Sequence, residues 1–189
     1  DFVFDGRKTS PYTEDDRPGP LSVYAASKLA GEYLLASAWE KHFIVRTCGL
    51  FGRAGCLEKG RNFPETMIAL AGQGRTIRVV SDQIVAPTST LELARNVAAL
   101  IETQAYGLYH LTSRGECSWY EFARAVLDLA GLRADLIPVA THEYGSRARR
   151  PAYPILSDAK ARALGLPGCS DWRTALAAYM KERGRVKTV

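Results

Sequence analysis

Tyr24 and Lys28 are two residues whose types and spacing could do chemistry together, in the stretch "VYAASKLAGEYLL". Four positions apart on a helix, their side chains would share one face with Cβ atoms roughly 5–6 Å apart, so both could act on one ligand. A free tyrosine titrates at about pH 10, and a nearby ammonium favours the phenolate. Lys28 is therefore expected to make Tyr24 a usable proton donor at neutral pH.

A solvated helix surface is the alternative for this pair, because two common residues at this spacing occur by chance in many helices. The context favours chemistry. Tyr24 falls in the first turn of a predicted helix that follows a strand-like run and a loop rich in Pro and Gly. Ligands of doubly wound sheets bind at the carboxyl ends of strands, so we interpret the pair as catalytic candidates.

Hydrophobic periodicity predicts the elements that position this pair. Residues 1–4 have the pattern of a short strand, and Ser22 can cap the helix that follows the loop. The run "HFIVRTCGLFG" predicts a strand buried on both faces. The first helix is expected to pack on a sheet through an apolar stripe formed by Val23, Ala26, Leu29, Ala30, Tyr33, Leu34 and Ala38.

Helices and strands alternate along the rest of the chain, which is typical of a parallel α/β sheet. Strands are predicted over "TIRVV" and "YGLYHLT", and helices over "NFPETMIALAGQG", after "SDQIVAPTST" and over "SWYEFARAVLDLAG". The last two helices have candidate capping boxes at Ser89–Glu92 and Ser118–Glu121. Two short helices are expected over residues 157–164 and 171–183. The side chains expected to point inward from the helix after "SDQIVAPTST" are Leu93, Val97, Leu100 and Ile101.

Composition and charge narrow the class of protein. The 189 residues are 47% hydrophobic, enough for a globular core, and their net charge of +5 favours anionic ligands such as nucleotides. We expect no nucleic-acid partner, because scattered surface charge accounts for the basic excess, and no membrane partner, because no apolar run approaches the roughly 18 residues that span a bilayer. A cytoplasmic location follows as an expectation. The cysteines lack metal-ligand spacing, so we expect no metal site and buried or idle thiols at Cys48, Cys56, Cys117 and Cys169.

Ordered motifs carry a resemblance to a known family. "DFVFDG", "PYTEDDRPGPLSVYAASKLAGE", "RTCGLFG", "RNF" and "SDQIVAPTSTLELA" together resemble the extended short-chain dehydrogenase/reductase superfamily, and more narrowly the dTDP-4-dehydrorhamnose reductase family. The likeness continues through "RRPAYPILSDAKARALGL" and "DWRTAL", so it covers nearly the whole chain. It implies the latter part of a Rossmann-like doubly wound parallel sheet plus a smaller α/β substrate-binding lobe, with the N-terminal nucleotide-binding part absent.

The same resemblance implies a division of the chain. Residues 1–52 and 84–112 would form the end of the dinucleotide-binding half. Residues 53–83 and 113–189 would form the substrate-binding lobe.

The activity implied by the resemblance is reduction of the 4-keto group of a nucleotide sugar, namely dTDP-4-dehydrorhamnose to dTDP-L-rhamnose, by NADPH or NADH. Tyr24 would donate a proton to the keto oxygen, and Lys28 would hold the nicotinamide ribose hydroxyls. The family's Ser or Thr that binds the carbonyl lies just before the residue matching Asp1. The glycine-rich cofactor fingerprint is also absent from the sequence, so we expect the chain alone to bind cofactor poorly and not to turn over.

The resemblance also implies contacts with the nucleotide sugar. An arginine would suit the diphosphate, because a guanidinium pairs bidentately with phosphate oxygens. Structural roles are the alternatives: helix capping for Asn62 and Thr88, core packing for Phe63, and a solvated basic run for Arg150. The candidate contacts are Asn62, Phe63, Asp82, Gln83, Pro87, Thr88 and Arg150.

Several alternatives stay open at the level of sequence. An epimerase or dehydratase with tightly held NAD would share the Tyr24 and Lys28 pair, and the non-catalytic beta subunit of methionine adenosyltransferase also resembles these reductases. Gly49 stands where the family usually has a tryptophan against the sugar, which leaves the sugar open, as are metal dependence and a homodimer. Trp119 and Trp172 are expected in the core, and His110 in a structural role.

Overall fold

The computed structural model describes residues 1–54, 60–146 and 148–185. Its strands pair two by two, and parallel pairs outnumber antiparallel ones. The predicted α/β class is confirmed. The parallel pairs are β1 (Phe43–Arg46) with β6 (Gly107–His110), β2 (Leu50–Phe51) with β5 (Thr88–Ser89), and β3 (Ile77–Val80) with β8 (Leu136–Val139), while β4 (Ile84–Val85) and β7 (Cys117–Ser118) pair antiparallel.

Helices alternate with these strands where the periodicity predicts them. Gly131 ends one of them in the left-handed conformation with φ 66°, as a helix-terminating glycine should. The helices are α1 (Val23–Ala38), α2 (Phe63–Ala71), α3 (Thr90–Ile101), α4 (Trp119–Ala130), α5 (Thr141–Tyr144), α6 (Ala159–Ala163) and α7 (Trp172–Arg185).

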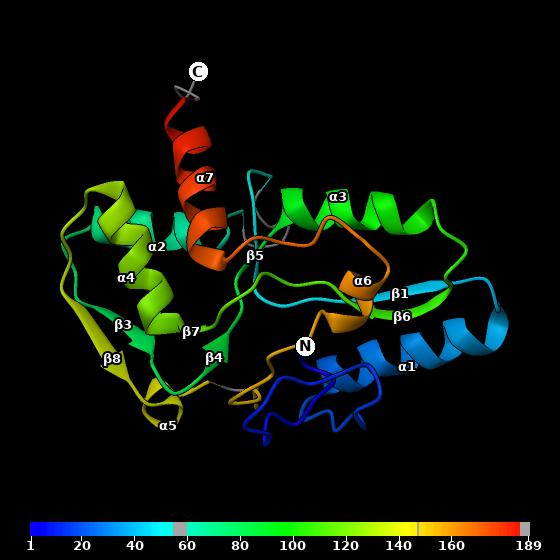
Figure 1. The fold of residues 1–189 in the computed structure, drawn as a ribbon. Helices are drawn as coiled ribbons and strands as arrows, with labels where there is room; N and C mark the ends of the chain where they lie inside the picture. Colours follow the sequence, from blue (N-terminus) through cyan, green and yellow to red (C-terminus); the bar gives the residue numbers. More distant parts are fainter. Residues whose placement is uncertain (55–59, 147, 186–189) are drawn as a thin grey trace.

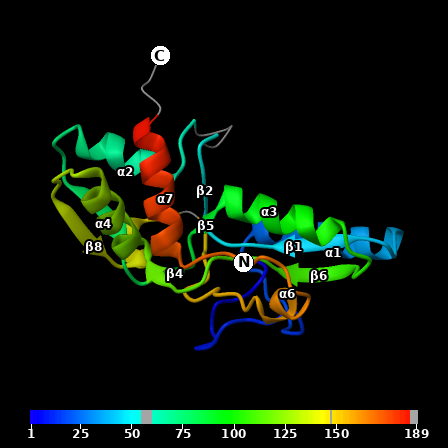
Figure 2. The same ribbon diagram turned by 45° about the horizontal axis from the view of Figure 1, so that its top comes forward.

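The molecule has two regions, which lie at opposite ends of the view in Figure 1. In the α4 region, helix α4 packs on β3 and β8, and α2 and α7 pack against α4 (Figures 1 and 2). In the α1 region, α3 packs on one side of the β1–β6 pair, and α1 lies on the other side, joined to β1 by the Glu32–Arg46 ion pair (Figure 1). The largest hydrophobic cluster, which includes Phe122, Trp172 and Leu176, belongs to the α4 region. The division of the chain given above stays a prediction.

The apolar stripe predicted for α1 does not pack on the sheet. Leu34 is 69% exposed and Ala25 is the buried residue of this helix. The prediction is wrong because no described segment covers the outer faces of α1, which meets the rest of the chain along Ala25 and Leu29. The exposed members of the stripe are Val23, Ala26, Ala30, Tyr33, Leu34 and Ala38.

Burial also falls short of prediction at two further places in the α1 region. Phe43, Ile44 and Val45 of β1 are half-buried, not buried on both faces. Ile101, at the end of α3, is exposed, while Leu100 is buried as predicted.

The run "HFIVRTCGLFG" is broken into β1 and β2 by a turn at Gly49, where φ is 50°. The strand predicted over residues 1–4 is also wrong, because its backbone groups bond within a turn and to a loop. The amide of Phe4 donates to the Asp1 carbonyl at 3.1 Å, and the amide of Gly19 donates to the Val3 carbonyl at 2.8 Å.

The N-termini of the helices show which of the predicted serine caps form. Ser22 Oγ accepts from the Ala25 amide at 3.2 Å, so the predicted cap of α1 is confirmed. The capping box of Ser118 and Glu121 is confirmed as well, with both reciprocal hydrogen bonds formed. Ser89 makes no side-chain cap, so that predicted box is wrong.

The described cysteines, Cys48, Cys117 and Cys169, are buried free thiols, as predicted. Burial raises the pKa of Cys48 to about 11 and that of Cys117 to about 12. Cys56 lies outside the described residues. Across the described part of the chain, no helix has both the length and the apolar character to cross a membrane.

Candidate active site

A cavity of about 380 Å³ opens in the α4 region, within the size range of small-molecule sites. Its walls come from the start of α2, from β3, from the start of α4 and from the segment around α5. It brings together four of the predicted substrate contacts, Asn62, Phe63, Gln83 and Arg150. The other lining residues are Arg61, Thr66, Met67, Arg78, Val79, Val80, Trp119, Tyr144 and Ser146.

Aromatic side chains form one wall of the cavity. The rings of Phe63 and Trp119 lie 4.7 Å apart between centroids, and Phe63 stacks on Phe122 behind it at 5.4 Å and 13°. Phe63 therefore packs on the core and faces the cavity at the same time. Trp172 is buried in the core as predicted, whereas Trp119 is half-buried and lines the cavity.

Positive charge lines the same space. Arg61, Arg78 and Arg150 border the cavity, and none of its described lining residues is a carboxylate. Guanidinium groups match phosphate oxygens in charge and geometry. The cavity can therefore accept an anionic ligand with an aromatic or apolar part. Arg147, which belongs to the same basic run of sequence as Arg150, lies outside the described residues.

Asn62 is buried at the N-terminus of α2, where it both caps the helix and borders the cavity. Its Oδ1 accepts from the Glu65 amide at 2.9 Å, so it caps the helix. Its Nδ2 donates to the Gly52 carbonyl at 2.6 Å and to the Tyr179 hydroxyl at 3.1 Å. These bonds fix the edge of the cavity, and contact between Asn62 and a substrate stays a prediction.

Asp82 and Gln83 share a partner in Thr141, at the start of α5. Gln83 is buried, lines the cavity and donates from Nε2 to Thr141 Oγ1 at 2.9 Å. Asp82 accepts from the Thr141 amide and, at 2.6 Å, from its hydroxyl. Partial burial opposes ionisation, but these hydrogen bonds hold the pKa of Asp82 below its ordinary value. Asp82 thus anchors α5, which carries Tyr144 to the cavity.

Pro87 and Thr88 lie away from this cavity. Thr88 is fully buried, and its hydroxyl donates to the Ala86 carbonyl at 2.9 Å and accepts from the Ser113 amide at 3.1 Å. The alternative of a helix cap is wrong for Thr88, because Ser89 occupies the cap position of α3. Thr88 instead ties β5 to the segment after β6.

Gly49, the position of the family's tryptophan, also lies outside the lining residues. A Cβ there would come within 2.7 Å of Val85 Cγ2 and 3.3 Å of Pro87 Cα. Together with the positive φ of 50°, this close approach makes glycine the residue that the local backbone requires.

Tyr24 and Lys28 lie on α1, as the sequence predicts, and both are exposed. The ring of Phe2 meets Tyr24 edge-on, with 6.2 Å between centroids. Within the described ranges, neither the Tyr24 hydroxyl nor the Lys28 ammonium has a hydrogen-bonding partner or ion pair. Both groups are thus presented to solvent, where a ligand could reach them.

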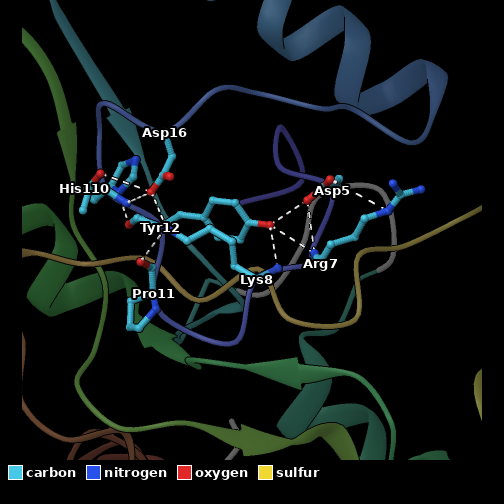
Figure 3. Close-up of polar contacts among 8 residues, drawn as sticks. Asp5, Arg7, Lys8, Pro11, Tyr12, Asp16 and His110 are labelled. Atoms are coloured by element: carbon cyan, nitrogen blue, oxygen red, sulfur yellow. Dashed lines mark hydrogen bonds and ion pairs between the residues drawn. The ribbon is translucent and has the colours of Figure 1, made fainter.

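The loop before α1 is held by a polar network around Tyr12 (Figure 3). The Tyr12 hydroxyl donates to Asp5 Oδ1 at 2.6 Å and accepts from the Arg7 amide at 3.1 Å. Lys8 pairs with Asp16 at 2.7 Å. Because these bonds fold residues 5–16 on themselves, the loop delivers the chain to Ser22 in a defined direction.

His110 is fully buried beneath this loop and has the predicted structural role. Its Nδ1 lies 3.1 Å from the Tyr12 carbonyl (Figure 3). Since a carbonyl only accepts, Nδ1 carries the proton. Burial, reinforced by the charge of Arg46, lowers the pKa of His110 to about 3. The imidazole is therefore neutral across the physiological range.

The sequence does not predict that Arg78 and Tyr144, which are far apart in the chain, line the same cavity. Arg78 on β3 and Tyr144 on α5 both border the cavity, and the Arg78 guanidinium donates at 3.3 Å to the carbonyl of Glu143, the residue before Tyr144. The alternation of "TIRVV" places Arg78 on the opposite face from Ile77 and Val79, which indicates exposure but not a site. Arg61 could have been found, because it directly precedes Asn62.

A family model described as RmlD substrate binding domain matches residues 1–184 of the chain. The spore coat polysaccharide biosynthesis protein SpsK of Bacillus subtilis is 42% identical over 183 residues, which are 97% of this chain and 62% of that protein. A dTDP-4-dehydrorhamnose reductase of Sinorhizobium fredii is 38% identical over 80% of this chain and 53% of its own length. The chain thus spans between half and two thirds of these relatives.

Solved structures share the fold. The crystal structure of dTDP-4-dehydrorhamnose reductase from Bacillus anthracis, in complex with NADP, gives a TM-score of 0.90 at 38% identity, over 96% of this chain and 63% of that one. The orthologue from Clostridium acetobutylicum gives a TM-score of 0.90 at 36% identity, over 97% and 63% of the two chains. The Rossmann-like α/β fold predicted from the sequence is confirmed by these likenesses.

Proposed function

Because the chain belongs to the RmlD substrate binding domain family, we propose that it carries the substrate pocket and proton donor of a nucleotide-sugar reductase. The relatives named dTDP-4-dehydrorhamnose reductase make dTDP-4-dehydrorhamnose the substrate of this proposal and dTDP-L-rhamnose the product. The observation that carries it is the cavity of the α4 region, where arginines and aromatic rings border one space.

The cavity suits a nucleoside diphosphate part by part. The guanidinium groups of Arg61, Arg78 and Arg150 match the two phosphates, and the rings of Phe63 and Trp119 match the flat base. Binding this end of the substrate would leave the sugar to extend toward the reacting groups. Remote binding of this kind supplies the orientation that a bimolecular reaction lacks.

The reacting groups in this proposal are Tyr24 and Lys28. Tyr24 donates a proton to the 4-keto oxygen, and Lys28 donates hydrogen bonds to ribose hydroxyls of the cofactor. These exposed donors fit the nicotinamide ribose, since an ammonium offers three donors to a diol. NADPH or NADH would supply the hydride. The remaining chemistry of this chain is positioning and proton transfer.

Two further points belong to this proposal. Residues 1–52 with 84–112 would form the end of the dinucleotide-binding half, and residues 53–83 with 113–189 the substrate lobe. The cytoplasm is the compartment we propose, because the reaction consumes reduced nicotinamide cofactor. A homodimer is left to measurement.

The test compares two tyrosines of one helix. Tyr24 and Tyr33 are both 61% exposed on α1, so Tyr24→Phe and Tyr33→Phe remove the same hydroxyl at equal solvent access. Oxidation of NADPH with dTDP-4-dehydrorhamnose is measured on the full-length gene product. We expect Tyr24→Phe to lower kcat by about 10²- to 10⁴-fold, the usual worth of a general acid. Tyr33→Phe should retain wild-type turnover.

Two outcomes would overturn this proposal. A wild-type protein that binds dTDP but oxidises neither NADPH nor NADH with this sugar is not this reductase. Equal activity of the two phenylalanine variants would remove Tyr24 from the chemistry.

A further inference from the structure

Helix α1 places Tyr24, Lys28 and Glu32 along one stripe, each four residues after the last. Side chains at this spacing meet, and a lysine with a glutamate one turn later forms an ion pair on isolated helices, although this order is weaker than glutamate before lysine. Glu32 is therefore the natural local partner for the Lys28 ammonium. Such a pair would draw the ammonium away from Tyr24 and from a ligand.

The structure shows a different pairing for Glu32. Its carboxylate accepts from Arg46 on β1, with Nε at 3.0 Å from Oε1 and Nη2 at 2.6 Å from Oε2. The Arg46 side chain is 6% exposed and that of Glu32 15%. Lys28 makes no ion pair within the described part of the chain.

The geometry explains why Arg46 outcompetes Lys28. Its planar guanidinium binds both carboxylate oxygens at once, which an ammonium cannot do. The guanidinium also lies over the Phe4 ring at 5.0 Å, so its orientation is fixed from a second side. Glu32 thus points inward to β1 while Lys28 points outward.

The pair is not optimised for stability. Arg46 Nη1 is buried and has no hydrogen-bonding partner among the described residues. Buried ion pairs often add little stability compared with well-packed apolar residues, so we look for a reason for this pair other than stability. Here the reason is that the pair holds the Glu32 carboxylate against β1 and away from Lys28.

We propose that Arg46 is a positioning residue for the reaction, because by holding Glu32 it keeps the Lys28 ammonium available to Tyr24 and the cofactor ribose. This inference rests on the proposed function. Arg46 acts through Glu32 and does not touch the reacting atoms. The pair also ties α1 to β1, which fixes the helix that presents Tyr24.

The test measures how available the Lys28 ammonium is, without substrate or cofactor. Folded protein is treated with limiting acetic anhydride, and acetylation of Lys28 is quantified by mass spectrometry. Lys181 on α7 is exposed in the other region and serves as the internal reference. Wild type is compared with Arg46→Gln, Glu32→Gln and the double variant, and thermal unfolding confirms that each is folded.

The expected pattern is asymmetric between the two partners. Arg46→Gln releases Glu32 to Lys28, so acetylation of Lys28 should fall by about 1.5-fold, the worth of one helical pair with lysine before glutamate. Glu32→Gln removes the competing carboxylate, so it should leave the rate at the wild-type value. The double variant should recover that value. A purely structural tie would instead make the double variant at least as altered as Arg46→Gln.

Two results would overturn the proposal: an unchanged Lys28 rate in Arg46→Gln, or no recovery in the double variant. If Arg46→Gln does not fold, Arg46→Lys keeps the charge but loses the two-point contact, and a smaller decrease is expected. In the active protein, Arg46→Gln should raise KM for NADPH, with recovery in the double variant. If wild type shows no turnover, the proposed function fails, while the acetylation result still decides where Glu32 is held.

Discussion

Helices α1 and α4 begin in the same way and end up in opposite surroundings. Each starts at a serine whose hydroxyl accepts the amide three residues on, Ser22 for α1 and Ser118 for α4. Helix α4 buries Phe122, Ala123, Val126 and Leu127, whereas α1 buries Ala25 alone. Local sequence therefore decides that a helix forms, and the rest of the chain decides what it buries.

The two helices also differ in their proposed roles: the α4 region frames the binding cavity, and α1 carries the candidate reacting groups. The cavity is framed by the densely packed α4 region, so its shape is set by a rigid core. The candidate proton donor stands on a helix held by Ala25, Leu29 and the Glu32–Arg46 pair. A few contacts thus fix the orientation of Tyr24, so the loss of any one of them should change that orientation.

Phe122→Ala gives the largest expected effect, because it empties the centre of the α4 region. The ring is fully buried and lies within 6 Å, between centroids, of Phe51, Phe63 and Trp172. Its removal should lower the free energy of unfolding by about 3–5 kcal/mol. Leu34→Ala on α1, where the side chain is 69% exposed, should change it by about 0.5 kcal/mol or less. Urea titration measures both.

Equal destabilisation by the two substitutions would break the comparison. It would mean that the exposed face of α1 is packed in solution as tightly as the core of the α4 region.

The sequence predicts those parts of the fold that depend on neighbours in the chain. The Ser118–Glu121 box and the terminal Gly131 are local signals, and both act as predicted. The Ser89–Glu92 box fails because a distant segment takes its carboxylate: Glu92 accepts from the amide and the hydroxyl of Ser170. No local pattern shows that competition.

The same distinction between local and long-range signals applies to the candidate site. Asn62, Phe63, Gln83 and Arg150 are brought to one cavity, although the contacts with substrate stay predictions. Thr88 belongs to a buried network that depends on Thr112 and Ser113, residues far along the chain. Motifs thus indicate which segments gather, while long-range pairing decides which side chains face the ligand.

His110 provides the next effect, within the α1 region. Its pKa is 6.5 in an ordinary setting and about 3 in the fold, where burial and then Arg46 disfavour the charged ring. Folding thus favours the neutral ring. Below pH 6.5, His110 is protonated in the unfolded chain but stays neutral in the folded protein. Stability is full above pH 6.5 and is lost progressively as the pH falls toward about 3.

The measurement is the urea midpoint of wild type and His110→Asn between neutral pH and about pH 5. Asparagine keeps a donor for the Tyr12 carbonyl and does not titrate. Wild type should lose about 1–2 kcal/mol more than the variant over this interval. Carboxyl groups with lowered pKa, such as Asp5 and Asp16, are common to both proteins and cancel. Parallel pH dependence would show that His110 accepts a proton in the folded state.

The smallest effect compares two serines at equivalent helix starts. Ser118 Oγ accepts the Glu121 amide at 3.1 Å, and Glu121 returns a bond to the Ser118 amide at 2.7 Å. Ser89 caps α3 without a side-chain hydrogen bond. Ser118→Ala should therefore lower the free energy of unfolding by about 1 kcal/mol, and Ser89→Ala by a few tenths at about the limit of measurement.

Thermal unfolding of both variants sharpens the comparison, because serine becomes alanine in each and only the cap differs. Since Glu92 accepts from both the hydroxyl and the amide of Ser170, Ser170→Ala removes the hydroxyl's bond, leaves the amide's bond and thereby weakens the competition for the Glu92 carboxylate. In this background Glu92 can turn back toward its own helix start, so Ser89→Ala should cost more than it does in wild type. A cost that stays the same would show that the bond of Glu92 to the Ser170 hydroxyl is not what prevents the box from forming.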